Sequence, residues 1–227
     1  MPTTSKTSRS SRGKPVVTNT LVFSYLTLRK VVGLLGTVLP FVLFFGGLLI
    51  FGRHLQSSMS AYYYTPMRDV FVGTLWAIGF FLLSYQGYGL ADSIAAKLAC
   101  VFAVGVSLFP TTPDQMITPA AQTIGYVHAG FAAAMFITLI YFSMVLFTKT
   151  APRKKPTKRK LLRNKVYVAC GIVMAICIFV AILQAALPRF GVTVLNGHSL
   201  LFWLEAFSIV AFGVSWIVKG EWILKDQ

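Results

Sequence analysis

Six long apolar runs constrain the fold of this chain more than any other feature of its sequence. They cover residues 31–51, 70–90, 93–109, 124–147, 166–187 and 199–218. A transmembrane helix needs about 20 mostly apolar residues, and the runs are long and continuous, without the alternation typical of barrel strands. The sequence therefore predicts an all-α, polytopic membrane protein with six transmembrane helices in one bundle.

The composition supports a membrane-embedded chain without a soluble domain. Hydrophobic residues make up 56% of the sequence and charged residues 12%, whereas soluble domains carry about 25% charged residues. We expect a transmembrane domain over residues 31–220, preceded by a disordered, basic cytoplasmic tail over 1–30. A second basic cytoplasmic segment, 149–165, is predicted to be a flexible loop because it is rich in charge and contains two prolines.

Basic residues are distributed unequally between the two sides of the predicted bundle. A cytoplasmic N-terminus places most of the 21 basic residues inside and leaves three outside, namely Arg53, Arg68 and Arg189. Cytoplasmic loops of membrane proteins carry an excess of Lys and Arg, so both termini are predicted to be cytoplasmic. The net charge of +15 follows this topology, and segment 149–165 has no aromatic residue to stack on bases, so no nucleic-acid partner is expected.

The predicted topology brings a small set of polar residues to the outer half of the bundle. Arg68 and Asp69 open the second helix, His128 lies about one turn into the fourth, and His198 precedes the sixth. Tyr63 lies on the approach to them. Thr65 and Pro66 also form a good helix start, so Asp69 could simply interact with the helix dipole, and the tyrosines could belong to an interfacial aromatic belt.

Glu205 is the most costly of these residues because it lies well inside the last apolar run. An acid at the centre of a membrane helix costs roughly 2.5–3.5 kcal/mol on insertion scales, and such residues usually face a partner or a wet cavity. We therefore expect Glu205 to have a partner, and His128 or Arg68 is the natural candidate. Together, the residues of the predicted outward-facing pocket are Tyr63, Arg68, Asp69, His128, His198 and Glu205.

Three functions are compatible with such a pocket. In the first, Arg68 binds the anionic headgroup of a lipid or small amphiphile. In the second, Asp69, His128 and His198 hold zinc and Glu205 acts as acid or base in a membrane lipid hydrolase. In the third, the same residues pair within the bundle of a non-catalytic structural or assembly subunit. The chain has no HExxH, GxSxG, P-loop or GxGxxG motif.

Three short motifs resemble those of a known membrane family. They are Tyr-x-x-Pro-x-Arg-Asp at 63–69, Leu-Phe-Pro-Thr-x-Pro at 108–113 and Gly-x-x-His at 125–128. They resemble the bacterial six-helix family termed domain of unknown function 998 over roughly residues 30–220, and this resemblance implies six helices without an established reaction. The pattern is more distantly similar to six-helix proteins of lipid remodelling and autophagy modulation.

The motifs are also similar to alkaline-ceramidase-type hydrolases, which hold zinc with histidines and an aspartate. Asp69, His128 and His198 are the only residues that could correspond to that zinc site. The chain departs from those enzymes because six helices are predicted instead of seven and the paired histidines of the final helix are missing. From sequence, the expected partners are membrane lipids and a further membrane protein, and the expected location is a bacterial inner membrane.

Overall fold

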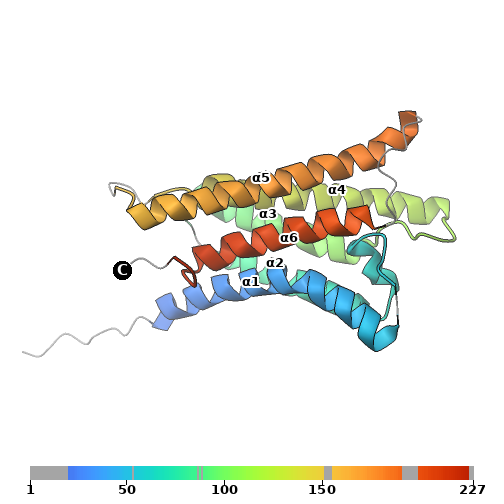
Figure 1. Cartoon of the computed structure of the whole chain (residues 1–227), viewed down its shortest axis with the longest axis horizontal. Helices are drawn as coiled ribbons and strands as arrows, with labels where there is room; N and C mark the ends of the chain where they lie inside the picture. The colour runs from blue at the N-terminus through green and yellow to red at the C-terminus, as the bar shows by residue number, and fades with distance from the viewer. Residues whose placement is uncertain are drawn as a thin grey trace, which may run out of the picture.

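The computed structural model describes residues 20–52, 54–85, 87, 89–150, 155–190 and 199–224, and these residues form helices joined by short segments (Figure 1). Helices α1 and α4 are each continued by a π-helical turn, Gly46–Ile50 and Phe142–Leu146 respectively. The six helices are α1 Thr20–Phe45, α2 Arg68–Leu83, α3 Leu90–Leu108, α4 Pro119–Tyr141, α5 Lys158–Ala186 and α6 Leu200–Lys219. The described residues contain no strand, so the all-α prediction is confirmed.

Five of these helical stretches are long and apolar enough to cross a membrane. They are Leu26–Ile50, Leu90–Leu108, Pro119–Leu146, Lys158–Ala186 and Leu200–Lys219. This confirms the prediction of an integral membrane protein. Helix α2 has 16 residues, which at 1.5 Å per residue give about 24 Å, less than the hydrocarbon thickness of about 30 Å. The predicted second helix, 70–90, was too long because Ser84, Gly87 and Gly89 follow Leu83.

The first and fifth helices begin earlier than the apolar runs predicted. Helix α1 starts at Thr20, so the predicted disordered tail over 1–30 was too long at its C-terminal side; residues 1–19 lie outside the described part of the chain. Helix α5 starts at Lys158 because the Thr157 hydroxyl caps it, accepting a hydrogen bond from the Lys160 amide at 3.0 Å. The basic loop is therefore shorter than 149–165, and residues 151–154 lie outside the described residues.

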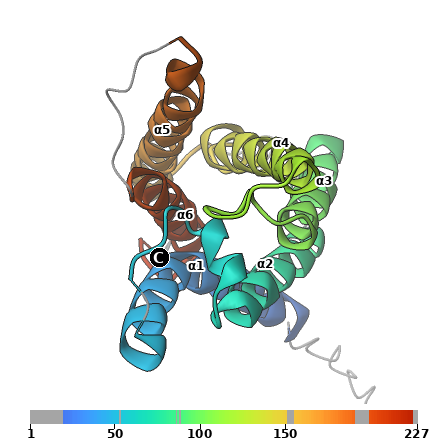
Figure 2. The same cartoon turned by 90° about the vertical axis from the view of Figure 1, so that its right-hand side faces the viewer.

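The helices form a ring in which each packs on the next along the chain (Figure 2). Helix α6 closes the ring by packing on both α5 and α1. Small residues allow antiparallel α1 and α6 to approach closely: a Cβ added to Gly213 would lie 2.6 Å from the Gly33 carbonyl oxygen. Glycines permit such backbone approaches in lipid, where packing replaces the hydrophobic effect as the driving force.

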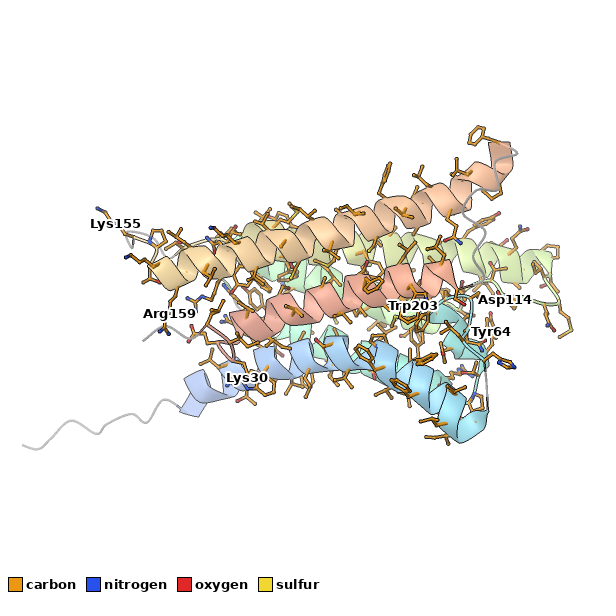
Figure 3. All side chains as sticks on the ribbon, in the orientation of Figure 1. Lys30, Tyr64, Asp114, Lys155, Arg159 and Trp203 are labelled. Carbon is orange, nitrogen blue, oxygen red and sulfur yellow. The ribbon has the colours of Figure 1, made fainter. Side chains whose placement is uncertain are left out.

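The two ends of the bundle differ in charge. Lys30, Lys155 and Arg159 lie at one end, here called the basic end, whereas Tyr64 and Asp114 lie at the other, the tyrosine end (Figure 3). An aromatic cluster fills the interior at the basic end and consists of Tyr85, Phe142, Phe147, Tyr167 and Trp216, each at most 4% exposed. The start of α1 and the end of α6 both lie at the basic end (Figure 1).

Candidate functional site

The chain between α1 and α2 turns into the ring at the tyrosine end (Figure 2). This entrant segment, residues 57–67, includes a 3₁₀ helix, Ser60–Tyr64. Its residues Ser58, Met59, Ser60, Ala61 and Tyr62 are at most 6% exposed. The Ser58 hydroxyl accepts a hydrogen bond from the Ala61 amide at 2.9 Å. The segment is therefore part of the core rather than a surface loop.

Contacts with α6 hold the entrant segment in place. The Phe202 amide donates a hydrogen bond to the Ser57 carbonyl at 3.1 Å, and the Tyr62 ring packs on the Phe202 ring with centroids 6.0 Å apart. On the α1 side, a Cβ added to Gly47 would lie 3.0 Å from the Tyr62 ring.

Glu205 of α6 binds the backbone of the entrant segment. Its Oε2 accepts a hydrogen bond from the Met59 amide at 2.6 Å, and the carboxylate also bonds the Ser60 backbone. These are the amides that a helix leaves without internal acceptors at its N-terminus, where an anion is favoured. Neither His128 nor Arg68, the predicted partners, forms an ion pair with Glu205 in the described structure. The expectation that Glu205 has a partner is met by a different group.

A small cavity lies beneath the entrant segment and reaches Glu205. Its volume is about 30 Å³, enough for a water molecule, which needs about 10–15 Å³ measured in this way. The cavity is lined by Leu39, Met59, Ser60, Phe71, Leu75, Val106, Ala132, Met135, Phe136, Glu205 and Ile209. Among the described residues of the predicted pocket, Glu205 alone is in this lining, so those described residues do not come together around the cavity.

Arg68 and Tyr63 meet on the outer surface of the tyrosine end. Arg68 Nη2 donates a hydrogen bond to the Tyr63 hydroxyl at 2.7 Å, and Arg68 Cζ lies 4.3 Å from the centre of the Tyr63 ring. A cation at this distance over an aromatic face is attracted by the ring. Tyr63 and Arg68 are only five positions apart in the sequence, which is why the sequence predicted that they lie together.

Asp69 lies in the first turn of α2, as predicted, and is exposed. Thr65 and Pro66 were predicted to start this helix, but α2 begins at Arg68. The Thr65 hydroxyl accepts a hydrogen bond from the Met67 amide at 3.2 Å. Neither Asp69 nor Arg68 forms an ion pair with any residue in the described ranges. Asp69 therefore forms no ion pair with the other predicted pocket residues that the structure describes.

His128 is buried, at 4% exposure, and its Nδ1 lies 2.6 Å from the Phe109 carbonyl oxygen. This hydrogen bond ties α4 to the residue that follows α3. His198 lies outside the described residues. Across the part of the chain that the structure describes, no three His, Cys, Asp or Glu side chains are grouped to hold a metal, and a zinc site that includes His198 stays a prediction.

Sequence reasoning missed the role of residues 57–62. The signal that could have indicated a local turn is Ser58 three residues before Ala61, a spacing at which a serine hydroxyl binds a backbone amide. The inward course of the segment had no comparable signal, because it depends on the space left by six helices far apart in sequence.

These features define a helical integral membrane protein whose ring is closed by an entrant segment at one end and by aromatic side chains at the other. In comparisons with known proteins, no family model, curated protein or solved structure matches the chain.

Proposed function

We propose that the protein binds the anionic headgroup of a lipid or small amphiphile at the tyrosine end, with Arg68 as the principal contact. The observation that carries this proposal is the geometry of the Arg68 side chain. Its guanidinium is held against the Tyr63 ring, is exposed, and has no carboxylate partner among the described residues. A guanidinium presents several donors in a planar fork that suits phosphate and carboxylate groups.

An apolar groove beside the start of α2 supports a lipid as the bound molecule. The groove has a volume of about 220 Å³ and runs between α1 and α2, lined by Leu34, Leu35, Val38, Leu39, Val42, Val70 and Thr74. Val70 and Arg68 both lie in the first turn of α2, so the groove reaches the depth in the bundle at which Arg68 enters the helix. The proposal also includes membership of the six-helix family that the motifs resemble. It places the protein in a bacterial inner membrane.

The headgroup proposal predicts weaker lipid binding by Arg68→Gln. Hydrogen bonds to charged groups contribute about 1.5–3 kcal/mol, so affinity for phosphatidylglycerol should fall about tenfold or more. Native mass spectrometry of detergent-purified protein, titrated with phosphatidylglycerol or with inorganic phosphate, measures this and separates lipid from free phosphate. Lys97→Gln is the matched control, because it removes one exposed positive charge elsewhere on the bundle.

Equal retention of phosphatidylglycerol by Arg68→Gln and the parent protein would remove Arg68 as the contact. Metal analysis of the same preparation addresses the hydrolase alternative, since stoichiometric zinc lost in His128→Ala would replace the lipid-binding proposal. The structural-subunit alternative is favoured by the bonds of Glu205 and His128 to backbone groups within the bundle. It predicts that Arg68→Gln changes no lipid binding but that a partner protein co-purifies.

The proposal includes a topology of six passes with both termini in the cytoplasm. The concentration of basic residues at one end of the bundle supports this topology. In it, α2 and the entrant segment together make the second pass through the membrane. We expect Lys155→Cys to react with a membrane-impermeant maleimide only from the cytoplasmic side and Asp114→Cys only from the outside. The native cysteines, Cys100, Cys170 and Cys177, are buried and give a low background. Labelling of both variants from one side would contradict six passes.

A further inference from the structure

Four basic side chains from three helices converge at the basic end, the opposite end of the bundle from the proposed lipid site. This cationic cluster consists of Arg29 of α1, Lys160 and Arg163 of α5, and Lys219 of α6. Lys219 is coupled electrostatically to the other three. Arg163 and Lys219 are buried, at 6% and 9% exposure. Like charges therefore lie close together where water screens them poorly.

Contacts with aromatic rings restrict the positions of three members of the cationic cluster. The distances to the ring centres are 5.5 Å from Arg29 Cζ to Tyr85, 5.5 Å from Lys160 Nζ to Tyr167 and 5.2 Å from Lys219 Nζ to Phe147. A cation near an aromatic face is attracted by the ring. Lys160 Nζ also donates a hydrogen bond to the Phe147 carbonyl at 2.6 Å. The cluster is therefore preorganised, as a binding site for an anion requires.

The described carboxylates at the basic end balance only part of this charge. Asp92 is fully buried and pairs with Lys149 at 3.1 Å, and Glu221 pairs with Arg163 at 3.5 Å. The cationic cluster and Lys149 thus bring five positive charges against the two negative charges of these carboxylates. Buried charge is costly unless a counter-charge accompanies it. The surplus of positive charge indicates a place for an anion.

The start of α5 adds to the positive field. The first turn of this 29-residue helix holds basic residues, Lys158 to Lys160, and no acid, although the N-terminus of a helix carries partial positive charge and favours acids. The usual excess of basic residues in cytoplasmic loops explains the exposed ones. The last turn of α6 favours a cation at Lys219. Neither effect requires Arg163 and Lys219 to be buried beside one another's charges, whereas a bound anion does.

The chain that follows α6 folds back and brings a carboxylate to the cationic cluster. Arg163 Nη1 lies 3.5 Å from Glu221 Oε1 and 3.5 Å from the Leu224 carbonyl oxygen. A strong guanidinium–carboxylate hydrogen bond is shorter, about 2.7–2.9 Å. Glu221 and Leu224 also have φ angles of 56° and 59°, in the left-handed region that side chains with a Cβ adopt at a cost. Glu221 is therefore a weak partner that a better anion can displace.

We propose that the cationic cluster binds a phosphate monoester group, which replaces Glu221 as the partner of Arg163. A phosphate monoester carries about 1.5–2 negative charges at pH 7, more than one carboxylate supplies. The Arg163 guanidinium can hold two of its oxygens, and Lys219 contributes a further positive charge. The group can come from a lipid headgroup, as in phosphatidic acid, or from a soluble phosphate compound. Exposed apolar residues beside the cluster favour the lipid, namely Leu161, Leu162, Trp222 and Ile223.

Titration of the full-length, detergent-purified protein with phosphatidic acid tests this inference, with native mass spectrometry as the readout. All variants carry Arg68→Gln, so that the proposed site at the tyrosine end does not contribute and the two proposals can fail separately. Lys219→Gln should lower the affinity about tenfold or more, the effect of losing a hydrogen bond to a charged group, and Lys219→Arg should largely retain it. Glu221→Gln should raise the affinity, because it removes the competing carboxylate.

Lys155→Gln is the matched control, since Lys155 is exposed at the same end and the change removes the same charge; it should retain the affinity. Thermal melts establish folding, and Lys160→Gln takes the place of Lys219→Gln should that variant not fold. Parallel titrations with inorganic phosphate distinguish the sources: binding of phosphatidic acid alone indicates a lipid, and binding of both indicates a soluble phosphate compound. The inference is overturned if neither binds, or if Lys155→Gln and the cluster variants lose affinity equally.

Discussion

Gly213→Leu is expected to abolish the folded bundle. A Cβ at Gly213 would lie 2.6 Å from the Gly33 carbonyl oxygen and against the Thr37 hydroxyl, and a Cβ at Gly33 would lie 2.7 Å from Ile217. Backbone atoms of two helices cannot yield as a flexible side chain does, so α1 and α6 must separate. Overpacking a core costs about 1–3 kcal/mol and occasionally more, and Gly213→Ala already falls at the upper end of this range.

Unfolding in a titration of SDS against mild detergent, followed by circular dichroism, measures the effect. Gly73→Ala is the control, because Gly73 lies within α2 and a Cβ there would meet no atom within 4 Å. An alanine in a helix is favoured over glycine by about 1 kcal/mol, so this variant should be at least as stable as the parent. A Gly213→Ala protein as stable as Gly73→Ala would show that α1 and α6 are not in close contact.

Glu205→Ala is expected to destabilise the protein by about 2–5 kcal/mol and to release the entrant segment. The carboxylate is the acceptor for the Met59 amide, at 2.6 Å, and for the Ser60 backbone. Leaving a buried donor without an acceptor costs about 1–3 kcal/mol, and two donors are affected here. Glu205→Gln retains one carbonyl oxygen as an acceptor and should lose roughly half as much stability.

Release of the segment can be measured separately from stability. Ser60 is 6% exposed, so a Ser60→Cys protein should react slowly with a water-soluble maleimide. Adding Glu205→Ala should increase the rate at least tenfold, while Glu205→Gln should increase it less. Unchanged labelling and unchanged stability in the alanine variant would mean that packing of Tyr62 on Phe202, rather than Glu205, holds the segment.

Much of the fold followed from the sequence because a membrane helix is a local property. Length and hydropathy of one run are enough to indicate a span, and five of the predicted spans are confirmed. Helix ends were less accurate, since a cap such as Thr157 lies outside the apolar run. The second span was overestimated because its hydropathy continues past Leu83 although the helix does not.

The sequence predicted the candidate site correctly only where the residues in contact are close together in the chain. Tyr63 and Arg68 are five residues apart and do meet. Glu205 was rightly expected to have a partner, but that partner is a backbone segment 146 positions away, which no side-chain pattern reveals. His128 likewise binds a carbonyl rather than a predicted side chain.

Residue chemistry along the chain was therefore sufficient to establish a helical membrane protein and to select Glu205 as an unusual residue, because the cost of an acid in lipid does not depend on the fold. The inward course of residues 57–67 and the full burial of Ser208 and Ser215 on α6 arise from the closure of the helix ring. Closure depends on which helices touch, and it is this packing that buries Ser58, Met59 and Tyr62.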